Sequence, residues 1–111
     1  MTAISQGIRE LTKRAIADNK VMVFSKSYCP YCIRTKDLLE DLNVDYHAME
    51  LNEHKDGVDI QQALAELTSQ KTVPNVFINR QHIGGYSDLK ASFDSGKLTD
   101  ILKQAGIQHK L

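Results

Sequence analysis

Cys29 and Cys32 are separated by two residues, and they are the only cysteines among the 111 residues of the chain. Two thiols at this spacing on a helix lie one turn apart, so they can close to a disulfide and open again. A framework of structural disulfides would need more cysteines at wider spacing. The pair therefore indicates redox chemistry by thiol–disulfide exchange.

The surrounding residues predict different tasks for the two thiols. Residues 21–24 form a short apolar run typical of a buried strand. Pro30 suits the first position of a helix, where its missing N–H is no loss, so Cys29 would directly precede a helix. The helix N-terminus, with Lys26 nearby, would lower the pKa of the Cys29 thiol. We predict that Cys29 is the nucleophile and that the more buried Cys32 is the resolving thiol.

Two other interpretations of the cysteine pair stay open at this point. The pair could be half of a zinc site, although the histidines show no paired ligand spacing. Those histidines are His47, His54, His82 and His109. The pair could also be two inert core cysteines, but the strand–loop–helix setting with an intervening proline argues for the redox motif.

Hydrophobic periodicity predicts the elements that must position the pair. Helices are expected over residues 3–18 and 30–42, around 60–67 and 89–93, and over 98–105, with Gly106 following the last. Strands are expected over 21–24, 45–51, 76–78 and 81–83, the last two joined by a hairpin. A βαβ unit followed by a hairpin predicts an α/β fold, with a mixed four-stranded sheet flanked by about five helices.

Length and composition favour one domain over residues 1–111. Lys and Arg total 14, as do Asp and Glu, so no net charge draws the chain toward nucleic acid or an anionic membrane. No apolar run approaches the roughly 20 residues of a membrane span. The polar start lacks the pattern of a secretory signal, and we therefore expect a cytoplasmic protein.

Three motifs, in matching order and spacing, resemble those of dithiol glutaredoxins. They are Cys29-Pro30-Tyr31-Cys32, Thr72-Val73-Pro74 and Gly84-Gly85-Tyr86-Ser87-Asp88. The likeness runs from about Ala3 to Ala105 and is strongest to eukaryotic, notably fungal, cytosolic members. This resemblance implies the thioredoxin-like fold and glutathione as reductant and co-substrate.

The resemblance also implies a binding site for glutathione. Beside a cis Pro74, the Val73 main chain, next to Thr72, would pair with the cysteinyl residue of glutathione as an added strand. From residues alone, Pro74 could instead be a simple strand-edge proline. Gly84 and Gly85 lack Cβ atoms and would let another backbone, that of the ligand, approach closely.

The two ends of glutathione are assigned to charged and polar groups by the same resemblance. Ser87 and Asp88, at a helix start, would bind the γ-glutamyl carboxylate and ammonium, although residues alone also allow a simple cap. Lys26 and Gln61 would meet the glycyl carboxylate, and Tyr31 would flank the tripeptide.

The implied activity is glutathione-dependent reduction of protein–glutathione mixed disulfides and of protein disulfides. A glutathione reductase system would be an indirect partner, and we expect a monomer without metal, nucleic-acid or membrane partners. One alternative is a [2Fe–2S] carrier or sensor, but such glutaredoxins tend to have Gly or Ser where this chain has Pro30. Another is a thioredoxin-like reductase, although the chain has no Trp. A non-catalytic interaction module is the third.

Overall fold

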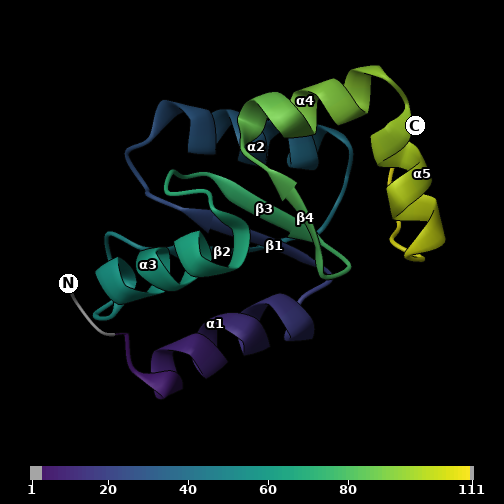
Figure 1. The fold of residues 1–111 in the computed structure, drawn as a ribbon. Helices are drawn as coiled ribbons and strands as arrows, with labels where there is room; N and C mark the ends of the chain where they lie inside the picture. The colour runs from purple at the N-terminus through teal and green to yellow at the C-terminus, as the bar shows by residue number, and fades with distance from the viewer. Residues whose placement is uncertain (1–3, 111) are drawn as a thin grey trace.

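A computed structural model describes residues 4–110 (Figure 1). The elements follow one another as α1 (Gln6–Asp18), β1 (Val21–Ser25), α2 (Pro30–Asp41), β2 (His47–Glu50), α3 (Gly57–Thr68), β3 (Asn75–Ile78), β4 (Gln81–Gly84), α4 (Tyr86–Asp94) and α5 (Lys97–Gln104). No helix among these residues is long and apolar enough to cross a membrane.

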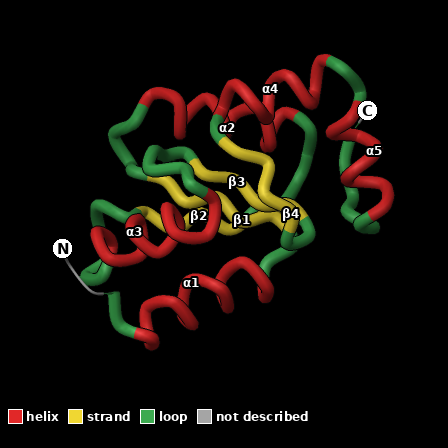
Figure 2. The backbone as a smooth tube through the Cα atoms, in the orientation of Figure 1, coloured by secondary structure: helices red, strands yellow, loops and turns green. Residues whose placement is uncertain are grey.

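The strands form one mixed sheet in the order β2-β1-β3-β4 (Figure 2). Strand β2 runs parallel to β1, whereas β3 is antiparallel to β1 and β4 is antiparallel to β3. The turn between β3 and β4 places Asn79 and Arg80 at positive φ, as a two-residue hairpin requires. Within residues 4–110 the structure confirms the predicted α/β fold, a mixed four-stranded sheet flanked by about five helices.

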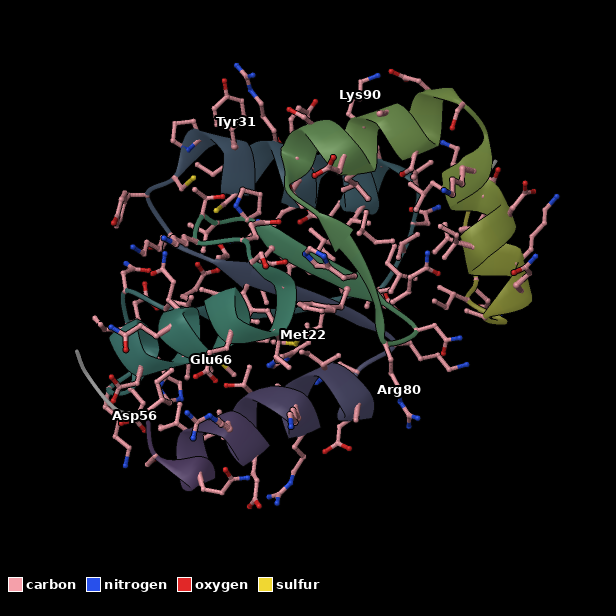
Figure 3. All side chains as sticks on the ribbon, in the orientation of Figure 1. Met22, Tyr31, Asp56, Glu66, Arg80 and Lys90 are labelled. Atoms are coloured by element: carbon pink, nitrogen blue, oxygen red, sulfur yellow. The ribbon has the colours of Figure 1, made fainter. Side chains whose placement is uncertain are left out.

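Helices cover both faces of the sheet, as Figure 1 shows. Val21 and Val23 point to the face covered by α2, α4 and α5, where they join a core that includes Leu89. Met22 and Phe24 point to the opposite face, toward α1 and α3 (Figure 3). All four residues are at most 2% exposed, which explains why β1 is a continuous apolar run rather than an alternating one.

Several elements are shorter than predicted. Helix α1 begins at Gln6, because the Ser5 hydroxyl accepts the Ile8 N–H at 3.2 Å and caps the helix. The predicted start at residue 3 lies outside the described residues. The strand predicted over 45–51 is limited to His47–Glu50, the stretch that pairs with Met22–Ser25 of β1.

Gly57 begins α3 where the helix passes very close to the chain that leaves β2. A Cβ atom at this position would lie 1.7 Å from the carbonyl oxygen of Leu51. That neighbour is main chain, so it cannot rotate out of the way. Glycine is therefore required here by space, and its presence sets how closely α3 lies against the sheet.

Gly57→Ala should lower the free energy of unfolding by about 3 kcal/mol, because the helix must shift to make room for the methyl group. Gly7→Ala is the matched control, since a Cβ there would meet only the Ser5 hydroxyl at 3.9 Å. The control should be neutral or raise stability by up to about 1 kcal/mol through helix propensity. Urea unfolding measures both, and equal effects of the two substitutions would contradict the steric argument.

Candidate redox site

Cys29 lies at the junction between the central strand and α2. Its main chain is extended, with φ −82° and ψ 121°, and it is the N-cap residue of the helix. The Cys29 N–H donates to the Lys26 carbonyl at 3.0 Å, and the Cys29 carbonyl accepts the Ile33 N–H at 3.0 Å. A turn and a helix therefore hold Cys29 from both sides, as the position of Pro30 predicted.

The two thiols differ in burial. Both cysteines are free, with Cys29 half-buried and Cys32 fully buried. The Cys32 sulfur accepts the Lys26 N–H at 3.5 Å, whereas the Cys29 sulfur lies 4.0 Å from the Val73 carbonyl oxygen. Cys29 is thus the accessible thiol of the pair.

Burial and hydrogen bonding shift the two thiol pKa values in opposite directions. Partial burial would raise the pKa of Cys29, but hydrogen bonds from the backbone and thiol of Cys32 and from the Tyr31 backbone, with the Lys26 charge, hold it below its usual value. Burial raises the pKa of Cys32, and the bond to Cys29 adds to this effect. At neutral pH the exposed sulfur is the more nucleophilic one.

A groove of about 460 Å³ lies beside Cys29. It brings together seven of the nine predicted binding residues, from α2, the segment before β3 and the start of α4. These are Tyr31, Thr72, Val73, Pro74, Gly85, Ser87 and Asp88, and the other lining residues are Gln70 and Tyr86.

Lys26 and Gln61 lie outside this groove. Lys26 acts on Cys29 through its charge, as described above. Gln61 lines a separate hollow of about 560 Å³, together with Val58 and Lys71, and its amide donates to the Lys71 carbonyl at 2.8 Å. Their predicted contacts with a glycyl carboxylate stay predictions.

The Val73 main chain is an unpaired backbone edge of the groove. The Val73–Pro74 peptide is cis, as the resemblance implied. Within residues 4–110 the Val73 N–H has no hydrogen-bond partner, and its carbonyl contacts only the Cys29 thiol. An extended peptide can therefore pair with Val73 as an added strand, next to the reactive sulfur.

Asp88 lines the groove at the N-terminus of α4. Its carboxylate accepts the Gly85 N–H at 3.1 Å and so caps the helix. Gly84 has φ +118°, and a Cβ on it would lie 2.3 Å from the Asp88 carboxylate. The interpretation of Gly84 and Gly85 as space for another backbone is therefore wrong for Gly84. Its missing Cβ leaves space for the Asp88 side chain.

Sequence reasoning assigned no role to two of the lining residues. The ring centroids of Tyr86 and Tyr31 lie 6.0 Å apart, and the Arg34 guanidinium lies 5.2 Å from the Tyr31 ring centre. Tyr31 projects from the start of α2 (Figure 3). Gln70 belongs to no motif, and only its closeness to Thr72-Val73-Pro74 in the chain could have drawn attention to it.

A structural zinc ion would need two further ligands besides the cysteine pair. Across residues 4–110, no group of three or more His, Cys, Asp or Glu side chains is placed to hold a metal ion. A thiol with a lowered pKa beside a second thiol is suited to exchange with a disulfide.

Comparison with known proteins finds similarity to glutaredoxins in both sequence and structure. A family model described as "Glutaredoxin" matches residues 21–83. A glutaredoxin of Solanum lycopersicum is 52% identical over 94 residues, covering 85% of this chain and 87% of the relative. The crystal structure of wheat glutaredoxin superposes with a TM-score of 0.87 at 48% identity, covering 90% and 96% of the two chains. The crystal structure of a buckwheat glutaredoxin–glutathione complex superposes with a TM-score of 0.86 at 38% identity, covering 92% of this chain and 96% of the other.

The lowered pKa of Cys29 should appear in its alkylation by iodoacetamide. The rate should rise with pH around a midpoint below about 8.5, the ordinary value for a cysteine, because only the thiolate reacts. Lys26→Met removes a positive charge that favours the thiolate, so the midpoint should move upward. Lys103→Met, on the exposed side of α5, is the matched control and should leave it unchanged. A midpoint unaffected by Lys26→Met would contradict the charge effect.

Proposed function

This chain belongs to the glutaredoxin family and is a glutathione-dependent thiol–disulfide oxidoreductase, and we propose that Cys29 is its nucleophile and Cys32 its resolving thiol. One observation carries the assignment: the half-buried Cys29 sulfur, with its lowered pKa, lies 4.0 Å from the carbonyl oxygen of Val73, which lines the groove. Cys32, fully buried behind it, has the higher pKa.

The first reaction is the reduction of a glutathionylated protein. The Cys29 thiolate attacks the glutathione sulfur, the bond to the protein sulfur breaks, and the protein thiolate leaves and takes up a proton. Cys29 is then disulfide-bonded to glutathione. A second glutathione thiolate attacks the glutathione sulfur of this disulfide, which releases oxidised glutathione and restores the Cys29 thiolate.

Glutathione would lie along the groove as an extended strand. Its cysteinyl main chain pairs with Val73, which holds its sulfur next to Cys29. At the start of α4, the free N–H groups favour the γ-glutamyl carboxylate, and the Asp88 carboxylate favours the neighbouring ammonium. Tyr31 flanks the tripeptide, and Lys26 and Gln61 are proposed to approach the glycyl carboxylate.

Protein disulfides take a second route that uses both cysteines. Cys29 attacks one sulfur of the substrate, and Cys32 then attacks the mixed disulfide, which releases the reduced protein and leaves a Cys29–Cys32 disulfide. Two molecules of glutathione reduce that disulfide again and become oxidised glutathione. A glutathione reductase system that restores glutathione is therefore an indirect partner.

We further propose that the protein works as a monomer in the cytoplasm. Every residue of the groove and both thiols come from one chain, so no second subunit is needed to complete the site. A glutathione-dependent dithiol needs a compartment whose glutathione pool is kept reduced, and the cytoplasm is such a compartment.

The two cysteines should be separable by mutation. Cys29→Ser should lower both reactions by more than about 100-fold, since an alcohol is a poor nucleophile here. Cys32→Ser should keep reduction of a glutathionylated peptide within about threefold and lose most reduction of a protein disulfide. Coupled assays with glutathione and glutathione reductase measure both substrates. Loss of deglutathionylation in Cys32→Ser would reverse the proposed roles.

Asp88→Asn should raise the KM for a glutathionylated peptide about tenfold, because a charge-assisted contact with the ammonium is weakened. The amide oxygen can still accept the Gly85 N–H, so thermal stability should hold. Asp88→Ala should raise the KM by a similar factor. It should also lower the free energy of unfolding by about 1 kcal/mol, since the helix cap disappears. Asp94→Asn, later on the same helix, is the matched control. An unchanged KM in both Asp88 variants would rule out the ammonium contact.

A further inference from the structure

Gln70 lies between the end of α3 and the Thr72-Val73-Pro74 motif. The left-handed Ser69 (φ 65°) ends the helix. The Gln70 N–H then donates to the Thr68 hydroxyl at 3.1 Å, and that hydroxyl donates in turn to the Leu64 carbonyl at 2.8 Å. The main chain of Gln70 is thus tied to the last turn of a helix that packs on the sheet.

The Gln70 side chain reaches from this anchor to the groove. Its Nε2 atom donates to the Thr72 carbonyl at 3.0 Å and to the Pro74 carbonyl at 2.9 Å. These are the residues on either side of Val73, and both distances are those of well-formed hydrogen bonds. Because an amide carries two N–H groups, one side chain can hold both carbonyls at once.

The bond to Thr72 determines where the Val73 N–H points. The Thr72–Val73 peptide is planar and trans, so its C=O and N–H point in opposite directions. With the Thr72 carbonyl held on the Gln70 side, the Val73 N–H must face the other way. This N–H has no partner in the part of the chain that the structure describes, and it is the donor that a paired strand would use.

The same amide lies near the α4 side of the groove. A Cβ atom built on Gly85 would lie 3.7 Å from the Pro74 carbonyl oxygen and 4.0 Å from Gln70 Nε2. The main chain at Gly85 therefore lies near this pair of groups. Gln70 lines the same groove as Val73, Gly85 and Asp88.

We propose that Gln70 is a positioning residue for glutathione, whose amide fixes the direction of the Val73 main chain so that the edge is ready to pair. It acts through Val73 and takes no part in the exchange of sulfur atoms. The inference rests on the proposed glutathione groove and adds a determinant of selectivity for glutathione over other mixed disulfides. A residue that served stability alone would show no such selectivity.

The test compares one peptide carrying its cysteine as a mixed disulfide either with glutathione or with free cysteine. Gln70→Met keeps the side-chain length but removes both N–H donors. The ratio of kcat/KM for the glutathionylated peptide to kcat/KM for the cysteinylated peptide should therefore fall about tenfold, because the rate with the glutathionylated peptide falls. Gln70→Lys restores a donor group and should regain part of the ratio. Alkylation of Cys29 against pH should be unchanged in Gln70→Met, which introduces no charge.

Gln104→Met, on the exposed side of α5, is the matched control and should keep the wild-type ratio. The proposal is overturned if Gln70→Met keeps that ratio, or if it lowers both rates equally. Gln70→Ala supplies the same comparison should the methionine variant unfold. A wild-type protein without preference for the glutathionylated peptide would instead refute the glutathione groove itself.

Discussion

The antiparallel pairing of β1 with β3 is the constraint on which the site depends. Phe24, near the end of β1, pairs with Asn75 at the start of β3. The chain that leaves β1 toward Cys29 therefore lies beside the chain that arrives at β3 through Val73 and Pro74. The antiparallel return of β4 brings Gly84 next to Val76 and so delivers the start of α4 to the same place. Three segments that are distant in sequence therefore meet at one end of the strands, because β1 pairs with β3 and β3 pairs with β4.

The redox site uses the end of one helix to make two similar thiols unequal. Cys29 precedes α2, where hydrogen bonds reach its sulfur while the surface stays open. One turn later, Cys32 is buried against the sheet and its thiolate is disfavoured. The difference arises from position rather than from extra residues, because the helix dipole and burial act in opposite directions over a single turn.

The sequence was informative where a residue type has few structural uses. Pro30 marked the helix start, the apolar run before it marked a buried strand, and the hairpin followed from two short segments on either side of Asn79-Arg80. Element ends were less predictable, because capping by Ser5 and the pairing range of β2 depend on atoms that periodicity does not describe. The resemblance supplied Thr72, Val73 and Asp88, which spacing alone could not have joined across the sheet.

Gln70 and Gly84 show what sequence reasoning could not reach. A glutamine is usually a solvated surface residue, so nothing in its type announces two hydrogen bonds to main-chain carbonyls. Gly84 was noticed but given the wrong neighbour, since only coordinates show that its missing Cβ leaves space for Asp88. Both cases concern the main chain, whose direction a residue code does not specify. A site that recognises a peptide by strand pairing would be built from such groups, and under our proposal its selectivity would depend also on Gln70, which positions the main chain.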